Sequence, residues 1–476
     1  MFTKEEYEKF IPTMKEMREE VKKDKYRLAY HIMPPTGWLN DPNGLCQFLG
    51  VNHIYYQYTP QTPTWGIKSW GHYTTKNWVE YHEEEPFLFA DSIYDCDGVY
   101  SGSAFVEDDK IHYFYTGNVK YNDKEYDYIT SGREQNTVLV TSTDGFTFDK
   151  KHLVLQNTDY PKDMSVHVRD PKIYKKNQRY YMVLGARSNQ DTGCVLLYVS
   201  DDLVTWKYHM RIESKIPFGY MWECPDLFDI EDKTFLVCCP QGVEQKGIDY
   251  ANVYQMGYFE VKLDLVNKSY ELSDFVELDR GFDIYAPQSF LDEQGRRILI
   301  AWMGIPDASY HNDKTVEHQW QHALTLPRKL CLEEGYLVSK PLEEFKQLRT
   351  HAKGISMKNQ GEEITPALYE AEFNFSTCET IELQLHEGIH LHYKNHILTL
   401  KLTECGCGRD SRSVVVHDLC KLQIFMDTSS IEIFVNDGRE VFTSRHYANQ
   451  ISKLKLQGVF EMVGTIYELK PFIIIK

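Results

Sequence analysis

Short runs of apolar and aromatic residues, separated by polar turns, fill most of the chain, and helical spacing of apolar residues is confined to roughly the first 25 residues. We therefore expect a short N-terminal helix within residues 1–27. Beyond it one unit recurs: a polar entry, a first strand, a charged turn and a second strand. Five such units predict a five-bladed β-propeller over residues 28–338, because a stacked solenoid usually has shorter repeats. The second strands begin 55 to 68 residues apart, at His53, Ile111, Arg179, Thr234 and Arg297.

The entry of each unit combines polar residues with a proline or a glycine. In a propeller the first strand of every blade lines the central channel, so the entries are expected to meet at one mouth of that channel. Three acids, Asp41, Asp170 and Glu223, stand at these entries. The five entries are Asn40-Asp41-Pro42, Ser101-Gly102-Ser103, Arg169-Asp170-Pro171, Glu223-Cys224-Pro225 and Tyr285-Ala286-Pro287.

The pattern changes after about residue 335, an estimate with the usual boundary error. Residues 339–350 are predicted to form a linker that contains a short helical turn. Alternating strands then return, and Asn436-Asp437-Gly438 between two apolar runs is a strong hairpin signal. Residues 351–476 are therefore predicted to form a C-terminal β-sandwich, which makes the whole chain all-β apart from its first helix.

The charge and composition of the chain disfavour some classes of binding partner. The net charge of −18 disfavours binding to nucleic acid or to anionic membranes, and no stretch has the apolar length of a membrane span. The N-terminus is charged throughout and lacks the apolar core of a signal peptide, so we expect a cytoplasmic protein. Because such a compartment is reducing, we expect the 11 cysteines to be free thiols.

The three entry acids carry the candidate chemistry. A single acid in a turn usually only caps that turn, but three acids at equivalent entries are harder to explain that way. Two facing carboxylates suffice to cleave a glycoside, and Trp65 and Trp302 could offer apolar faces to a sugar ring. The chain lacks the calcium-loop, zinc-site, phosphate-loop and dinucleotide-binding patterns, so we expect no metal and no cofactor.

Five motifs of the chain carry a resemblance to a known family. The segments "HIMPPTGWLNDPNGL", "SGSAF", "VRDPKIY", "WECPDLF" and "DRGFDIYAPQ" together resemble glycoside hydrolase family 32, which includes invertases, fructanases and sucrose-6-phosphate hydrolases. The resemblance runs from about His31 to "SSIEIFVNDGREVFTSR" and so covers nearly the whole chain. It implies a five-bladed propeller with a C-terminal β-sandwich, in agreement with the repeats.

The resemblance also implies roles for individual residues. Asp41 matches the family nucleophile, Glu223 the general acid/base and Asp170 the stabiliser of the transition state. Val168 replaces the phenylalanine that many members have before the RDP motif, a departure that leaves the acids untouched. The residues implied to line the fructose pocket are Asn40, Gln57, Trp65, Tyr100, Ser101, Arg169, Asp283, Tyr285 and Trp302.

The implied activity is retaining hydrolysis of terminal β-fructofuranosides, through a covalent fructosyl-enzyme. The partner is then a small carbohydrate: sucrose, its 6-phosphate or a short fructo-oligosaccharide. Two alternatives remain open, a fructosyltransferase on the same fold and a non-catalytic fructan-binding propeller. The sandwich could itself bind glycan, but a structural role is favoured, in which it braces the propeller and mediates a homodimer.

Overall fold

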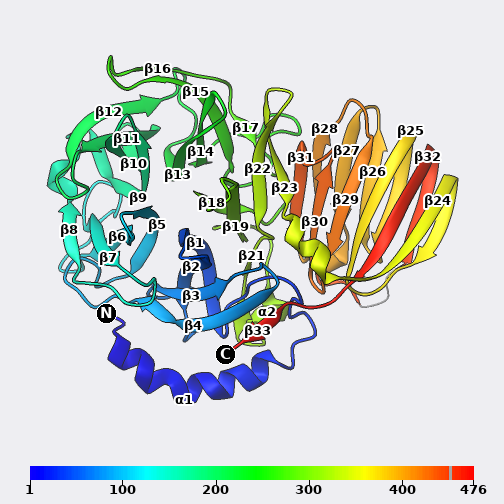
Figure 1. The fold of residues 1–476 in the computed structure, drawn as a ribbon, viewed down its shortest axis with the longest axis horizontal. Helices are drawn as coiled ribbons and strands as arrows, with labels where there is room; N and C mark the ends of the chain where they lie inside the picture. Colours follow the sequence, from blue (N-terminus) through cyan, green and yellow to red (C-terminus); the bar gives the residue numbers. More distant parts are fainter. Residues whose placement is uncertain (450–452) are drawn as a thin grey trace.

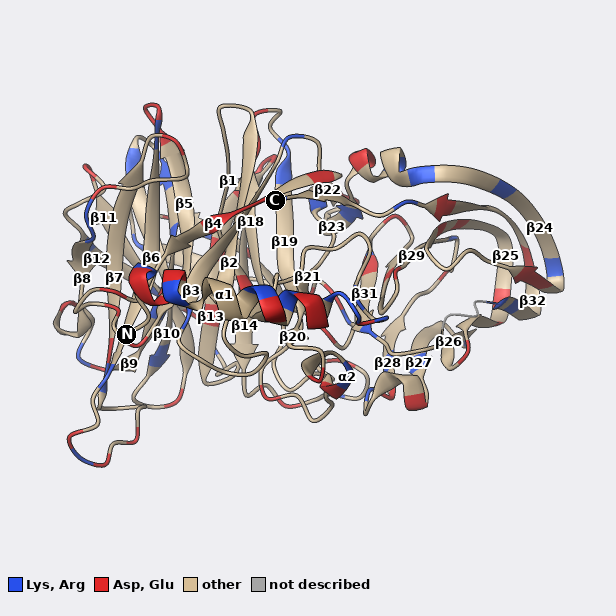
Figure 2. Ribbon diagram, turned by 90° about the horizontal axis from the view of Figure 1, so that it is seen from below, with Lys and Arg blue, Asp and Glu red and all other residues tan. Residues whose placement is uncertain are grey.

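The computed structural model describes residues 1–449 and 453–476, and most of them lie in strands. Helix α1 (Lys4–Val21) begins with a capping box, in which the side chains of Thr3 and Glu6 each bond the other residue's backbone N–H. The helix lies along the outside of the first sheet (Figure 1), where Arg18 forms an ion pair with Glu83. Acidic and basic residues are interspersed along the helix (Figure 2). None of the helices in the described residues is long and apolar enough to span a membrane.

Residues 37–341 form a β-propeller built from successive antiparallel sheets around a common centre (Figure 1). Within each sheet the strands largely follow chain order, which is the simplest way to connect antiparallel neighbours. The strands are β1 (Gly37–Phe48), β2 (Val51–Thr59), β3 (Ser69–Thr75), β4 (Glu80–Leu88), β5 (Val99–Glu107), β6 (Lys110–Lys120), β7 (Arg133–Ser142), β8 (His152–Leu155), β9 (Met164–Lys176), β10 (Arg179–Ser188), β11 (Gly193–Ser200), β12 (Lys207–Glu213), β13 (Met221–Ile230), β14 (Lys233–Gln241), β15 (Gly257–Asp264), β16 (Ser269–Leu272), β17 (Val276–Glu277), β18 (Tyr285–Leu291), β19 (Arg297–Met303), β21 (Ala323–Leu324), β22 (Arg328–Glu333) and β23 (Tyr336–Pro341).

The first strands pack against one another around the centre. Strand β1 contacts β5 and β18, β9 contacts β5 and β13, and β13 contacts β18, so these strands form a closed ring. Each of them also loses its regular register at the polar entry. The irregular segments are 39–42, 99–102, 169–172, 223–226 and 285–288. Bulges of this kind re-aim side chains, and here they occur at the same level of every first strand.

Two short strands close the first sheet with distant parts of the chain. Strand β20 (Trp320–Gln321), which follows helix α2 (Asp313–Val316), pairs in parallel with β1. Strand β33 (Ile473–Ile475) pairs in parallel with β4, so the end of the chain returns to the propeller. This differs from the predicted boundary, in which the sandwich runs to residue 476.

The C-terminal part is a sheet of nine strands that folds into a sandwich-like pair of layers. Strand β25 is long enough to serve both layers, because its first half pairs with β29 and its second half with β26. Residues 450–452 of the predicted sandwich lie outside the described residues. Short 3₁₀ turns η1 (Asn157–Asp159), η2 (Glu343–Leu348) and η3 (Glu404–Gly406) interrupt the strands, and η2 lies in the predicted linker. The sandwich strands are β24 (Arg349–Ile364), β25 (Tyr369–His386), β26 (Ile389–Lys394), β27 (Ile397–Leu402), β28 (Ser411–Val415), β29 (Lys421–Met426), β30 (Ser430–Val435), β31 (Glu440–Arg445) and β32 (Lys453–Leu469).

Buried charges join the propeller to the sandwich. Arg328 lies between Asp279, at 2.9 Å, and Glu432, at 2.5 Å. His31 contacts Glu432 at 3.0 Å and Asp427 at 2.7 Å. Each of these buried charges at the junction therefore has a partner of opposite sign. The predicted all-β class, with a propeller and a sandwich-like C-terminal sheet, is confirmed, whereas the number of blades stays a prediction.

Candidate functional site

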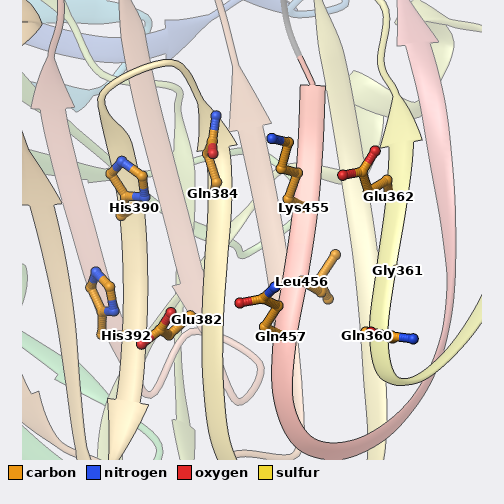
Figure 3. A pocket seen from close by; sticks show the side chains of 10 residues that line it. All are labelled: Gln360, Gly361, Glu362, Glu382, Gln384, His390, His392, Lys455, Leu456 and Gln457. Carbon is orange, nitrogen blue, oxygen red and sulfur yellow. The ribbon is translucent and has the colours of Figure 1, made fainter.

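One hollow of about 540 Å³ lies on the C-terminal sheet (Figure 3). Its polar side chains come from β24, β25, β26 and β32, with His390 and His392 on one strand and Glu382 on the next. The two imidazole rings stack 5.9 Å apart, but Glu382 forms no hydrogen bond or ion pair there. The hollow thus has polar groups without an organised network among them. The centre of the propeller has such a network.

Asp41 lies in the bulge of β1, where its side chain is only partly covered. The hydroxyl of Ser101, in β5, donates to Oδ2, and Asn40 donates from Nδ2 to Oδ1 at 2.9 Å. Asn40 also donates to Oε1 of Gln57 at 3.0 Å, and Gln57 donates to Ser101 at 2.5 Å. These four side chains form a closed ring of hydrogen bonds, which fixes the direction of the Asp41 carboxylate.

Asp170 lies in the bulge of β9 and is buried. Its φ of 63° and the φ of 48° at Cys224 are left-handed, a conformation that is costly for residues with a side chain and that concentrates at functional sites. The backbone N–H of Cys224 donates to Oδ2 of Asp170 at 2.9 Å. The thiol of the same cysteine lies 3.8 Å from Oδ2 of Asp41. Cys224 therefore links two of the predicted acids and is the direct neighbour of the third.

That third acid, Glu223, receives hydrogen bonds on both oxygens. Arg169 donates from Nε and Nη2 to Oε1 at 2.9 and 2.5 Å. Gln241 and Tyr285 each donate to Oε2 at 2.7 Å. These donors come from β9, β14 and β18, so three sheets hold the carboxylate in place.

The acids also affect one another electrostatically. Burial raises the pKa of Asp41, the hydrogen bonds from Ser101 and Asn40 oppose the shift, and the charge of Glu223 adds to it. Burial likewise raises the pKa of Asp170, with Arg169 opposing the change. Carboxylates in one pocket with environments that differ in this way are suited to separate roles in acid–base chemistry.

Aromatic rings form one wall of this site. The ring of Trp38 lies 6.4 Å from Trp65 and 6.1 Å from Trp302. Trp65 is 64% exposed, so its face is open to a ligand, whereas Trp302 is buried. The ammonium of Lys68 lies between two of these rings, 4.7 Å from the centre of Trp38 and 4.6 Å from that of Trp65. An apolar wall beside fixed polar groups is typical of carbohydrate sites.

The structure brings most of the predicted residues together but not Asp283. Both carboxylate oxygens of Asp283 accept hydrogen bonds from Arg409 at 2.7 Å, and the backbone N–H of Arg445 donates to it at 2.8 Å. Asp283 thus joins the sandwich to the propeller and has no free oxygen directed at the acids. Tyr100 lies beside Ser101 in β5 and is half-buried, and Tyr285 bonds Glu223 as described.

Four residues at the site were not predicted. Trp38 donates from its indole nitrogen to Asn40 at 2.7 Å, Gln241 bonds Glu223, Cys224 links two acids, and Lys68 lies against the tryptophans. Cys224 and Trp38 belong to the quoted motifs, so a search for every polar or aromatic neighbour of an entry acid would have found them. Lys68 and Gln241 lie away from the entries and have no such signal.

The arrangement supplies carboxylates and hydrogen-bond donors around one pocket. Within residues 1–449 and 453–476, His, Cys, Asp and Glu form no group of three or more that could hold a metal ion. Three carboxylates in one pocket can take separate chemical roles: one can attack a substrate, another can transfer a proton, and the third can stabilise positive charge.

Comparisons with known proteins agree on one family. The model described as "Glycosyl hydrolases family 32 N-terminal domain" matches residues 31–341, and the model "Glycosyl hydrolases family 32 C terminal" matches residues 343–465. The chain is 38% identical over 439 residues to the sucrose-6-phosphate hydrolase of Bacillus subtilis, with 89% of each chain covered. It is 36% identical to the corresponding protein of Staphylococcus xylosus, with 92% of this chain and 90% of that one covered.

Solved structures give the same result. The sucrose-6-phosphate hydrolase of Lactobacillus gasseri superposes with a TM-score of 0.89 at 28% identity, and 97% of each chain is covered. A mutant β-fructofuranosidase of Bombyx mori in complex with sucrose superposes with a TM-score of 0.85 at 29% identity, and 98% of each chain is covered.

Proposed function

Since the chain belongs to glycosyl hydrolase family 32, we propose that this glycoside hydrolase releases fructose from sucrose, sucrose 6-phosphate or short fructo-oligosaccharides with retention of configuration. The observation that carries the proposal is the joint placement of Asp41, Asp170 and Glu223, linked through Cys224 and Arg169. The names of the relatives support sucrose and its 6-phosphate as substrates.

Asp41 is proposed as the nucleophile. Its carboxylate attacks C2 of the fructosyl unit, forming a C2–Oδ bond while the bond from C2 to the leaving oxygen breaks. The hydrogen bonds from Ser101 and Asn40 support this role because they fix the attacking carboxylate in one orientation. An attack of this kind requires a separation of roughly 5–5.5 Å between the carboxyl groups of Asp41 and Glu223.

Glu223 is proposed as the general acid and then the general base. It gives its proton to the leaving oxygen in the first step, and in the second it takes a proton from the water that attacks C2 and frees Asp41. Arg169, Gln241 and Tyr285 support this role because they stabilise the carboxylate that remains after proton donation. Asp170 is proposed to bind fructose hydroxyls and to stabilise the positive charge that develops on the ring.

We also propose that the propeller has five blades and that residues 28–338 form the catalytic domain. The closed ring of β1, β5, β9, β13 and β18 supports this count, since each first strand belongs to a different sheet.

The stereochemical outcome tests the proposal. When methanol competes with water, a retaining enzyme should form methyl β-fructofuranoside, which NMR distinguishes from the α form. The α product would contradict the covalent route.

The variant Asp41→Asn replaces the proposed attacking oxygen. Its kcat should fall by roughly 10⁴-fold or more, and the protein should remain folded. Product analysis at high sucrose concentration separates hydrolysis from transfer to a second sugar.

A further inference from the structure

Arg133, the first residue of β7, has an unusual environment for an arginine. Its Nε is buried and has no hydrogen-bond partner. Among the described residues it is the one arginine whose side chain forms no hydrogen bond, ion pair or contact with an aromatic ring. Partial burial of a guanidinium without a partner costs free energy, unless an anion pairs with it.

The strand register places Arg133 at the edge of the proposed active site. It pairs directly with Lys120 of β6, so the two cationic side chains share one face of the sheet. Two residues further along the same face, Gln135 accepts a hydrogen bond from Arg169 at 3.1 Å. Arg169 in turn holds Glu223, the proposed proton donor to the leaving oxygen. Arg133 therefore lies on the leaving-group side of the acids.

The surroundings of Arg133 are positive although the whole chain has a net charge of −18. His167 donates from Nε2 to the carbonyl of Tyr128 at 2.8 Å and lies 2.6 Å from Nη1 of Arg169. Burial, together with the positive charges of Arg169 and Arg133, lowers the pKa of His167 to about 2. The imidazole is therefore neutral and does not attract a carboxylate to this corner.

Two acids whose charges act on these cations already accept hydrogen bonds. Asp97, beside Lys120, accepts one from the backbone N–H of Lys120 at 2.8 Å. Glu223, which acts on Arg133, is held by the three donors described above. No ion pair in the part of the chain that the structure describes involves Arg133 or Lys120. Both cations are thus available to a ligand.

We propose that Arg133, together with Lys120, binds the phosphate group of a phosphorylated hexose leaving group. This inference rests on the proposed function, since it assigns the leaving side of the same pocket. A guanidinium can offer two parallel N–H donors to a phosphate, and an adjacent ammonium adds a second positive charge. The preferred substrate is accordingly sucrose 6-phosphate, with the phosphate on the glucose.

The test compares sucrose 6-phosphate with sucrose. In the wild type, kcat/KM should be higher for the phosphorylated sugar. In Arg133→Gln the ratio of the two kcat/KM values should fall by roughly 10- to 100-fold, the loss expected when a charged hydrogen bond is removed. Lys120→Gln provides a second variant should the first fail to fold. Arg179→Gln is the matched control, because Arg179 is exposed and forms an ion pair with Asp201; its ratio should equal that of the wild type.

The other outcomes are distinguishable. If Arg133→Gln slows both substrates equally, the residue is structural and the inference is wrong. If inorganic phosphate inhibits the wild type but the ratio is unchanged in the variant, the site binds free phosphate and not the substrate. If the wild type releases fructose from neither sugar, the proposed function fails and the inference with it. If it hydrolyses both and the variants behave like the wild type, the inference alone is overturned.

Discussion

At the scale of single residues, the proposed mechanism requires Asp41 to be an anion when substrate binds. Burial raises the pKa of this carboxyl, so it would hold its proton to a higher pH than a free aspartate. Ser101 and Asn40 oppose that shift by hydrogen bonding. Burial lowers the pKa of the nearby Lys68 to about 7, while the charge of Asp41 acts to raise it. Below that pH the ammonium and the carboxylate stabilise each other.

Replacing Lys68 should therefore change the pH dependence of the reaction. In the proposed mechanism only ionised Asp41 can attack, so kcat/KM should rise with pH through the pKa of this group. Lys68→Met removes the positive charge that favours ionisation, and the acidic limb of the profile should move to higher pH by roughly one unit. Lys68→Arg keeps the charge and should keep the limb near its original position. Equal profiles for the methionine variant and the wild type would contradict the coupling.

The sequence located Asp41, Asp170 and Glu223 because each occupies an equivalent position in a repeated unit. Asp283 is implied by the family resemblance and not by the repeat; in the structure it pairs with Arg409 of the other domain, and no local sequence pattern indicates that pair. The repeat pattern also gives no indication of Lys68. Its position between two tryptophans depends on the conformation of the loop that carries it, which the sequence does not reveal.

At the scale of elements, the bulges of the first strands position the acids, and close packing between sheets keeps them there. Gly185 of β10 pairs with Arg169 of β9. A Cβ atom at this glycine would lie 2.2 Å from the carbonyl oxygen of Trp222, the residue before Glu223. The absence of a side chain at Gly185 therefore allows β13 to approach, so that Arg169 and Glu223 can meet.

Gly185→Ala should displace the backbone at Trp222 and with it the carboxylate of Glu223. A displacement on the order of 1 Å at a catalytic group can cost about 100-fold in rate, so we expect a loss of kcat of that size. Gly354→Ala in β24 is the matched control, because an added Cβ there would meet no atom within 4 Å, and its kcat should be normal. A Gly185→Ala enzyme with kcat within twofold of the wild type would refute the role of this packing.

Most strands could be predicted from short alternating runs, yet two features of their arrangement could not. The bent strand β25 supplies both layers of the sandwich, which alternation alone does not reveal. The pairing of β33 with β4 joins residues almost 400 positions apart, and a short apolar run at the end of a chain does not specify its partner.

At the scale of the whole molecule, buried charges hold the two domains together. Although burial acts to lower it, the hydrogen bonds and charges of Asp427 and Glu432 raise the pKa of His31. A raised pKa means that the charged histidine stabilises the folded state fully below the pKa of about 6.5 that a histidine has when unfolded. This contribution is lost as the pH rises through the higher value of the folded protein.

His31→Leu should lower the free energy of unfolding by roughly 3–5 kcal/mol at pH 6, because it leaves two buried carboxylates without their shared partner. The loss should become smaller as the pH rises through the raised pKa of His31 in the folded protein. Urea unfolding at pH 6 and at a series of higher pH values measures both effects. His351→Leu, at an exposed position, should change little. A His31→Leu loss that is independent of pH would show that the histidine acts only by packing.

The central claim, that Asp41 becomes covalently bound to fructose, can be tested most directly by trapping the intermediate. Glu223→Ala would be mixed with a β-fructofuranoside whose nitrophenolate leaving group needs no proton. The account predicts a burst of one nitrophenolate per enzyme and a fructosyl adduct on the peptide that contains Asp41, seen by mass spectrometry after acid quenching. An adduct on another residue, or nitrophenolate release without any adduct, would contradict it.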